Sequence, residues 1–573
     1  MKCEWNYQPL TPQQKQAAAE IDAGTGVGAA IAELLVRRQV TSAEEAEKFF
    51  APSLNDLHDP FLMPDMDKAV HRLNKAMGAK ERIMIYGDYD VDGTTAVALV
   101  YKYLQNYYSN IEYYIPTRYE EGYGISRKSI DYAAGRDVKL IIVLDCGIKA
   151  NEEIKYAKDK GIDFIICDHH VPDPELPPAA AILNPKLSGS TYPCKHLSGC
   201  GVGFKFMQAF AKSNGLQNHN ELESLLDLVA DIVPIVGENR IMVYHGMRRI
   251  NLNPNLGLRS IIRTCKLTNK EITISDVIFK IGPRINASGR MQSGIEAVDL
   301  MVSRDLHDAY EKGRAIDQYN KDRKELDKQI TLEANNIIEK NVEIVQGKRS
   351  IVIYNKNWHK GIIGIVASRL TELYYKPSVV LTYSNGLVTG SSRSVQGFDI
   401  YSAVDSARDL LENFGGHTYA VGLSLKEENI PEFSRRFEEY VAKHIRPDQL
   451  SPQTVIDACI SFSDITPEFL SLLKKFNPYG PGNQKPVFMT RSVFDFGTSK
   501  LVGKNMEHIK LELEDNSTSR VLNAIAFNMA PYFEHIHAHK PMDICYTIEQ
   551  AKHNKTGLNS IQLMIKDMRP SES

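Results

Sequence analysis

The chain has 573 residues, of which 43% are hydrophobic and 24% charged, so we expect about three or four domains with sizeable cores rather than a disordered or fibrous protein. The 68 Lys and Arg residues nearly balance the 71 Asp and Glu residues, and the formal charge of -3 excludes a strongly cationic surface overall but allows a local basic groove. The eight cysteines are scattered without a CxxC pair, which argues against a disulfide framework or a zinc site and favours reduced thiols.

No apolar run approaches the roughly 18 residues that a membrane span needs. The first residues, MKCEWNYQPLTPQQKQ, have no apolar segment behind a basic start, which is the pattern of an export signal. We therefore expect a cytoplasmic protein that has no membrane association.

The first half of the chain predicts short helices followed by a parallel sheet. Residues 1–80 have an apolar-periodic stretch, IAELLVRRQ, and turns bounded by prolines, which predicts a helical lead-in. From residue 81 the runs RIMIYGD, IEYYIP, LIIVLDCG, DFIICDHH and AAAILNP are nearly continuously apolar, as in strands that are buried on both faces. Helix-like segments such as TTAVALVYKYLQNYY lie between several of them, so residues 81–300 predict an α/β lobe with a doubly wound parallel sheet.

The second half predicts three further parts. Residues 301–345 are charged, with few apolar residues that fall on roughly one helical face, which is typical of a helix connecting two lobes. Residues 346–447 again alternate strand-like and helix-like segments, and predict a second α/β lobe. In residues 448–573 the segments KPVFMTRSVFDFG, HIKLELE and SRVLNAIAFN alternate with the two-residue period of antiparallel strands, which suggests a small barrel.

Three carboxylates follow the first predicted strand of the sheet. Asp88, Asp90 and Asp92 lie in the segment YGDYDVDG, at the strand end where open α/β sheets bind ligands. The spacing also suggests a calcium loop, but no Glu occupies the last position of such a loop and the preceding strand is wrong for an EF-hand. Taken alone, the segment is also compatible with solvated turn acids and a helix N-cap.

Two further strand ends favour a metal site. Asp145 ends the run LIIVLD, and Asp168 ends DFIICD before His169 and His170. The ends of neighbouring parallel strands converge, and clustered carboxylates repel one another unless a cation neutralises them. A lone histidine would more often be packed or at the surface, but oxygen ligands with imidazole suit Mn²⁺ or Mg²⁺ better than a structural zinc. Two such ions sharing a bridging carboxylate form a phosphoryl-transfer site.

These motifs carry a resemblance to a known family. GDYDVDG, LDCG and CDHHV resemble the successive motifs of the DHH phosphoesterase superfamily. Within it, the chain is similar to the RecJ family of bacterial single-strand-specific 5′→3′ exonucleases, from about residue 30 to the end. The further matching segments, in order, are PTRYEEGYGIS, LSGCGVGFKF, ADIVP, PRINASGRM, WHKGIIGIVASRL, GSSRSVQGFDI, FGGHTYAVGLSL and FNPYGPGNQKPVF.

The resemblance implies a DHH catalytic domain at 81–300, a connecting helix at 301–345, a DHH-associated domain at 346–447 and an OB-fold nucleic-acid-binding domain at 448–573. It implies two divalent metal ions, Mn²⁺ or Mg²⁺, with the ligands Asp90, Asp92, Asp145, His169 and Asp231. Asp145 would bridge the ions, and Asp88 would be an additional ligand or support the ligands. His170 would face the scissile phosphate as a stabiliser or acid.

The same resemblance implies the residues that bind the strand. Arg118, Ser391 and Arg393 would bind a 5′-phosphate, because an arginine fork suits phosphate, and Tyr123 would stack on the terminal base. The residues alone predict that Arg393 lies in a small-residue turn whose amides can approach an anion, and surface arginines in ordinary ion pairs are the alternative. The remaining implied contacts are Arg284 and Arg290 in a polar loop, and His417 in the glycine-rich loop FGGH.

The interpretation that follows is a metal-dependent 5′→3′ exonuclease that degrades single-stranded DNA to mononucleotides in DNA repair and recombination. We expect a monomer, with a single-strand-binding protein and a RecQ-type helicase as candidate partners. Lysines near the OB-fold support strand binding, although Phe476, Tyr479 and Phe488 could be core residues. The alternatives are a DHH phosphodiesterase acting on short oligoribonucleotides or cyclic dinucleotides, and a catalytically inactive single-strand-binding scaffold.

The sequence departs from the family pattern before one predicted ligand. RecJ proteins usually place several more residues between the helix reading LLDLV and the Asp of ADIVP, whereas here Asp227 and Asp231 are four positions apart. We assign the metal to Asp231, because ADIVP followed by GENR is the part that matches. Asp227 is then expected to be a helix-end or surface acid.

Overall fold

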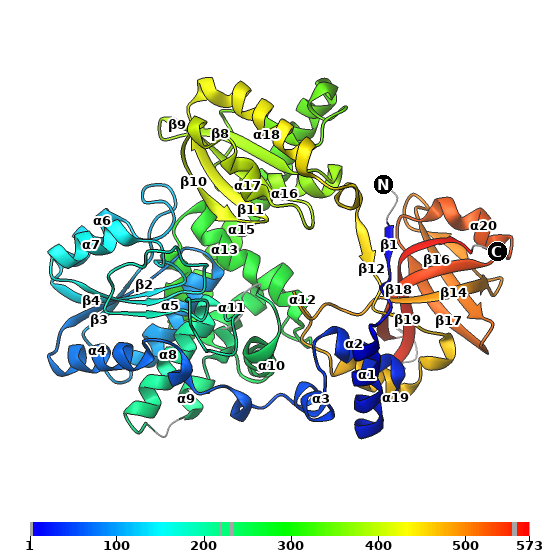
Figure 1. Ribbon diagram of the computed structural model, residues 1–573, viewed down its shortest axis with the longest axis horizontal. Helices are drawn as coiled ribbons and strands as arrows, with labels where there is room; N and C mark the ends of the chain where they lie inside the picture. Colours follow the sequence, from blue (N-terminus) through cyan, green and yellow to red (C-terminus); the bar gives the residue numbers. More distant parts are fainter. Residues whose placement is uncertain (1–3, 217–218, 229–232, 553–558, 572–573) are drawn as a thin grey trace. The chain divides into compact units, whose positions relative to one another are not determined.

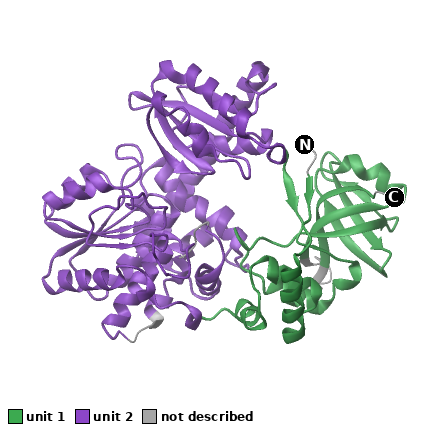
Figure 2. Ribbon diagram, viewed as in Figure 1, with its two compact units in different colours: residues 1–53, 451–573 green, residues 54–450 purple. Residues whose placement is uncertain are grey.

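The computed structural model of the protein describes residues 4–216, 219–228, 233–552 and 559–571 (Figure 1). The chain forms two compact units, one of residues 54–450 and one of residues 1–53 and 451–573 (Figure 2). No helix within the described ranges is both long enough and apolar enough to cross a membrane.

The first lobe of the unit 54–450 contains the predicted doubly wound parallel sheet. In spatial order its strands are β3 (Ile111–Tyr114), β2 (Arg82–Gly87), β4 (Val138–Leu144), β5 (Asp163–Cys167) and β6 (Ala181–Leu183), all parallel. The chain first moves outward from β2 to β3 and then crosses back to β4. The strand order therefore reverses between β2 and β4, and such sheets bind their ligands beyond the carboxyl ends of the strands at this point.

Alternating side chains place the sheet between two separate hydrophobic cores. Ile83 and Ile85 of β2 enter one core, while Met84 and Tyr86 enter the other, as the two-residue period of a strand requires. The first face carries α4 (Met66–Gly78), α5 (Val91–Leu104) and α8 (Gly199–Ser213), and the second carries α6 (Arg127–Gly135) and α7 (Asn151–Asp159) (Figure 1).

Helices follow the sheet and lead to the second lobe. They are α9 (His219–Glu223), α10 (Gly237–Leu252), α11 (Leu256–Thr264), α12 (Ile274–Asp276), the π-helical turn η4 (Val277–Ile281), α13 (Gly282–Met291) and α14 (Ile295–Met301). The segment PRINASGR, predicted to be a polar loop, lies in α13, because Pro283 falls in the first turn, where its missing N–H costs no hydrogen bond. The predicted connecting helix is confirmed as α15 (Leu306–Lys340), whose 35 residues span about 50 Å.

The second lobe has a mixed sheet in the order β10 (Leu411–His417), β11 (Ala420–Leu425), β9 (Leu387–Arg393), β8 (Ser378–Ser384) and β7 (Ile351–Tyr354). Helices α16 (Ile363–Tyr374), α17 (Ile400–Asp405) and α18 (Ile430–His444) pack on it. Two local predictions were wrong here. Ser391 and Arg393 lie in strand β9 rather than in a turn, and the glycine-rich segment FGGH lies in β10 rather than in a loop. Both strands are paired along their lengths, and this tertiary pairing overrides the local preference of Gly and Ser for turns.

The other unit contains the predicted small barrel, which is closed and has five strands. Strands β14 (Phe488–Asp495), β18 (Met542–Lys552), β19 (Asn559–Pro570), β17 (Thr518–Ala526) and β16 (His508–Asp515) pair in this order, and β16 pairs with β14 to close the ring. Its core is shared with the N-terminal helices α1 (Pro12–Thr25), α2 (Ala29–Arg37) and α3 (Ala43–Phe50). Strand β1 (Glu4–Asn6) pairs in parallel with β12 (Gln453–Val455).

Candidate active site

Acidic residues and histidines gather at the edge of the first sheet where the strand order reverses. Asp88 to Asp92 follow β2, Asp145 follows β4, and Asp168 to His170 follow β5. Asp145, His169 and His170 each offer a ligand atom within 4.8 Å of the others, which makes them a candidate metal cluster. The predicted convergence of these strand ends is therefore present.

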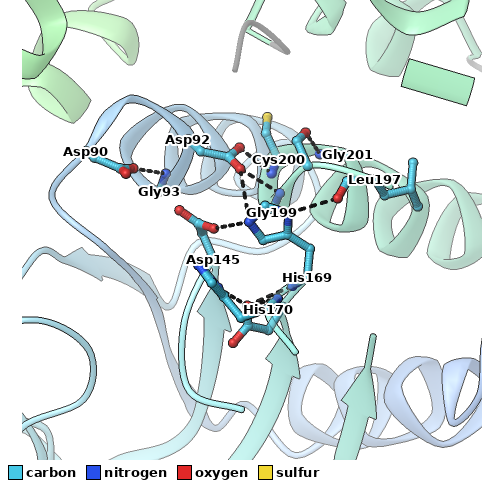
Figure 3. A network of polar contacts seen from close by, with 12 residues as sticks. Asp90, Asp92, Gly93, Asp145, His169, His170, Leu197, Gly199, Cys200 and Gly201 are labelled. Carbon is cyan, nitrogen blue, oxygen red and sulfur yellow. Dashed lines mark hydrogen bonds and ion pairs between the residues drawn. The ribbon is translucent and has the colours of Figure 1, made fainter. Parts of the chain in front are cut away.

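The helix α8 begins directly at this cluster and holds one of its carboxylates. Asp92 accepts hydrogen bonds from the backbone N–H groups of Gly199 and Cys200, both at 2.7 Å (Figure 3). These N–H groups have no acceptor within the helix, and the helix dipole adds to their attraction for a negative charge. Asp90 caps α5 by accepting from the N–H of Gly93 at 3.1 Å. The two acids are thereby fixed in different orientations although only one residue separates them.

His169 is oriented as a metal-binding histidine. Its Nδ1 lies 3.0 Å from the carbonyl oxygen of Leu197, which can only accept, so Nδ1 carries the proton (Figure 3). Burial, the charge of His170 and other neighbours lower the pKa of His169 to about 4, so its Nε2 is unprotonated at neutral pH. That nitrogen lies 3.1 Å from Asp145 Oδ1 and 3.9 Å from Asp92 Oδ2. A lone pair that faces two carboxylates is favourable only with a cation between them.

Asp88 supports the same conclusion. Its side chain is buried, and Oδ1 has no hydrogen-bond partner among the described residues. Burial, followed by the charge of Asp90, raises the pKa of Asp88 well above its usual value. A nearby divalent cation would reverse this shift, and the carboxylate-and-imidazole donor set is one that Mn²⁺ and Mg²⁺ accept. The residues present therefore fit a divalent metal, although the predicted ligand Asp231 lies outside the described residues.

Asp168 is a positioning residue that the sequence placed at a strand tip without giving it a role. It is fully buried, and its Oδ1 accepts from the N–H groups of His169 and His170 and lies 2.7 Å from His170 Nδ1. Burial opposes ionisation, but the hydrogen bond and charge of His170 dominate and lower the pKa of Asp168 to about 2. Asp168 thus fixes the turn that carries both histidines and leaves His170 Nε2 facing Tyr123 Oη.

The second lobe contributes a histidine to the same place. His417 at the end of β10 stacks on His170, with ring centroids 5.2 Å apart and planes 10° from parallel. Tyr123 Oη lies 3.4 Å from His170 Nε2 and 3.3 Å from the carbonyl oxygen of Asp145. The predicted residues His417 and Tyr123 therefore both lie beside the metal cluster.

Gly199 leaves room for the metal cluster. A Cβ atom at this position would lie 2.5 Å from the Cβ and 2.7 Å from the Oδ1 of Asp145, distances that real Cβ atoms do not show. Only glycine therefore allows α8 to begin so close to this carboxylate. The sequence signal for this contact is the glycine-rich segment SGCGVG.

Three of the predicted strand-binding arginines form a second group near the metal cluster. The guanidinium of Arg118 lies 3.9 Å from the ring centroid of Tyr89, and Arg393 Nη1 donates to Ser391 Oγ at 2.9 Å. Burial, followed by the charges of Arg118, Arg393 and Arg323, lowers the pKa of Arg290 to about 10. Among the described residues no carboxylate forms an ion pair with Arg118, Arg290 or Arg393, and the charge of Asp90 is the one that acts most on Arg290 in the opposite sense. This cluster can therefore accept a further anion.

Other predicted residues have a different surrounding. Arg284 forms an ion pair with Asp317 of α15 at 2.8 Å. Asp227 is buried rather than at the surface, which corrects our expectation, and burial raises its pKa to about 6. In the barrel unit, Phe476 and Phe488 are fully buried and belong to the core.

The sheet topology together with the acids and histidines at its edge defines a DHH phosphoesterase. The DHH family N-terminal domain matches residues 82–231, the DHHA1 domain matches 347–443, and the RecJ OB domain matches 456–567. The chain is 35% identical to the single-stranded-DNA-specific exonuclease RecJ of Bacillus subtilis over 95% of this chain and 68% of that protein. It is 32% identical to the RecJ of Haemophilus influenzae over 93% and 95% of the two chains.

The chain belongs to the RecJ family of single-stranded-DNA-specific exonucleases. The fold agrees with that of the crystal structure of Thermus thermophilus RecJ in complex with Mn²⁺, with a TM-score of 0.84. That alignment covers 100% of this chain and 80% of the other at 24% identity.

Proposed function

We propose that this protein is a metal-dependent exonuclease that degrades single-stranded DNA from the 5′ end to mononucleotides, in DNA repair and recombination. The observation that carries the proposal is the juxtaposition of His169, Asp145 and Asp92 at the sheet edge, where an unprotonated imidazole nitrogen faces two carboxylates. Membership of the RecJ family supports single-stranded DNA as the substrate.

Two divalent ions, Mn²⁺ or Mg²⁺, would be held by Asp90, Asp92, Asp145, His169 and Asp231, with Asp88 as a further ligand or a support. When bound, the ions would polarise a phosphoryl oxygen and make a water molecule more acidic. Helix α8 supports the ligand set through Asp92, and Leu197 fixes the tautomer of His169. The protein thus holds the ligands rigid before any substrate arrives, which reduces the reorganisation needed during the reaction.

His170 is proposed to act on the scissile phosphate. Asp168 lies against Nδ1 and leaves Nε2 on the side of Tyr123. In the protonated form Nε2 can donate to a phosphoryl oxygen or to the departing oxygen. The stack with His417 limits rotation of the ring, so the second lobe helps to position this group.

The arginine group is proposed to recognise the 5′ end of the strand. Arg118 and Arg393 would bind a 5′-phosphate through charge-assisted hydrogen bonds, with Ser391 as a further donor. Ser391 already holds the guanidinium of Arg393 in place. Tyr123, whose side chain is largely exposed, would stack on the terminal base, while Arg290 and Arg284 would contact the backbone.

The test uses single strands of DNA and RNA labelled at the 5′ or the 3′ end, incubated with Mn²⁺, Mg²⁺ or EDTA. We expect labelled mononucleotides from the 5′ label at the earliest times, cleavage of DNA in either metal, and none in EDTA. Preferential cleavage of short oligoribonucleotides or cyclic dinucleotides would instead identify the smaller-substrate phosphodiesterase. Strand binding without cleavage in any metal would identify an inactive scaffold.

We further propose that the protein acts as a cytoplasmic monomer, with a single-strand-binding protein and a RecQ-type helicase as partners. Light scattering of the purified chain measures the first property. Pull-down with each purified partner, with and without a single strand, measures the second.

A further inference from the structure

A cavity of about 190 Å³ lies within the unit 54–450, beside the acidic loop that follows β2. Its polar lining comes from Asn286 and Arg290 of α13 and from Arg323 of α15. Val91, which separates two predicted metal ligands, also lines it, so the cavity adjoins the candidate metal site.

Arg323 differs from the other arginines around α15 in lacking a carboxylate partner. Arg284 pairs with Asp317 at 2.8 Å, and Arg369 forms two hydrogen bonds of 2.7 Å with Asp327. Arg323 has no ion pair within the described ranges, and its buried Nε has no hydrogen-bond partner there. A buried donor on a charged group is costly to leave unsatisfied, so an acceptor is expected at this place.

The second guanidinium of the cavity, that of Arg290, likewise has no ion pair with a carboxylate among the described residues. Arg290 Nη1 donates to the carbonyl oxygen of Gly361 at 3.1 Å, a neutral partner that leaves the charge in place. Burial lowers the pKa of Arg323, and the charge of Asp327 opposes this shift. Burial and the charges of Arg118, Arg393 and Arg323 lower the pKa of Arg290, and the charge of Asp90 opposes them. Two mutually repelling cations that line one cavity favour an anion between them.

The remaining wall favours a nucleotide over a simple anion. Val277 and Ile278 of the π-helical turn η4, together with Pro283 and Ile365, give the cavity an apolar side. Such a surface can contact the sugar or base that is attached to a phosphate. A π-helical turn widens a helix locally and is frequent at functional sites.

We propose that this cavity is a subsite for one internal phosphodiester of the bound strand, held by Arg323 together with Arg290. The proposal rests on the proposed function, because it takes the strand as the ligand. It adds a binding residue, Arg323, to the strand contacts proposed above.

The experiment measures binding of 5′-phosphorylated (dT)12 to the full chain in EDTA, with each phosphate replaced in turn by a neutral methylphosphonate. In wild type, we expect one internal replacement to weaken binding about tenfold, the usual order for a charge-assisted hydrogen bond. In Arg323→Gln the unmodified strand should bind about tenfold more weakly, and that same replacement should then have no further effect. The slope of log K against log salt should fall by about 0.7.

The matched control is Arg314→Gln, because Arg314 lies on the exposed face of the same helix in an ion pair with Glu311. This variant should keep the wild-type methylphosphonate profile. The proposal is overturned if every methylphosphonate replacement, including the sensitive one, weakens binding to Arg323→Gln by the same factor as it weakens binding to wild type. It is also overturned by a loss confined to the 5′-terminal phosphate, which would place Arg323 at the strand end, or by weaker binding of dTMP with unchanged binding of (dT)12, which would make the cavity a product site.

Failure of the proposed function is distinguishable from failure of this inference. If one internal methylphosphonate replacement weakens binding to the wild-type protein but the protein cuts no strand in Mn²⁺, the proposed exonuclease activity is refuted and the proposed phosphate subsite stands. Wild type alone tests the proposal if Arg323→Gln does not fold, because the absence of any sensitive internal linkage also overturns it.

Discussion

Substitution of Gly199 by alanine should disable the metal site without touching a ligand. The new Cβ would lie 2.5 Å from the Cβ of Asp145, while ordinary contact begins at 3.4 Å, so the start of α8 and this carboxylate must separate by about 0.9 Å. A displacement of about 1 Å at a reacting centre costs about a hundredfold in rate. This corresponds to about 2.7 kcal/mol of lost transition-state stabilisation.

The assay is kcat/KM for release of labelled nucleotide from a single strand, measured over a Mn²⁺ titration. Gly201→Ala is the control, because there the nearest atoms are the end of the flexible Met242 side chain and Ser198 Oγ, both at 3.2 Å. It should stay close to wild type. Thermal unfolding of both variants reports the overpacking cost, about 1–3 kcal/mol at Gly199. If Gly199→Ala keeps more than half of the wild-type kcat/KM at every Mn²⁺ concentration, the inference that the added Cβ displaces Asp145 is wrong.

Four further predictions concern the carboxylates and the arginine group. Asp145→Ala should abolish cleavage in any divalent metal but preserve single-strand binding in EDTA. Each 1.4 kcal/mol of lost transition-state stabilisation lowers the rate tenfold, so activity above about a tenth of wild type would contradict a bridging role. Arg393→Ala should narrow the preference for 5′-phosphorylated over 5′-hydroxyl strands, measured as a ratio of kcat/KM, and an equal loss on both substrates would exclude an end sensor. Asp231→Asn should remove nuclease activity, while Asp227→Asn should leave it nearly intact. The opposite ranking would assign the metal ligand to Asp227 instead of Asp231. Because burial raises the pKa of Asp227 to about 6, its contribution to stability is present below about pH 4 and is lost as pH rises to about 6. Urea unfolding should therefore show Asp227→Asn gaining stability relative to wild type between these pH values, and a constant difference would contradict the buried acid.

The candidate metal cluster could be predicted because it depends on only one property of the fold. Strands buried on both faces are recognisable as apolar runs, and the carboxyl ends of parallel strands meet whatever the details of the helices. Asp145 and His169 could therefore be brought together from sequence. Their orientation could not, because it depends on the Leu197 carbonyl and on the beginning of α8, which are remote in sequence.

The errors occurred where local composition and tertiary pairing disagree. Ser391 and Arg393 lie among glycines and serines that favour turns, yet β9 is paired on both sides and has alternating burial. The ion pair of Arg284 with Asp317 was not predicted either, because Asp317 lies on another helix and no local pattern reveals it. The pairing of β18 with β19 within the barrel was also not predicted, since the visible strand patterns ended before residue 540.

The barrel unit is assembled from segments at opposite ends of the chain. Ile31 and Leu35 of α2 share a core with Phe488 of β14, and β1 pairs with β12. A ribosome therefore releases these N-terminal helices long before their partners exist, with the whole of residues 54–450 still to be made. Throughout that interval their apolar faces lack the barrel core that they share in the folded protein, and we expect them to be accessible to a chaperone during translation. A circular permutant in which residues 1–53 follow directly after residues 451–573 would remove this delay, because both segments of the barrel unit would then be synthesised one after the other.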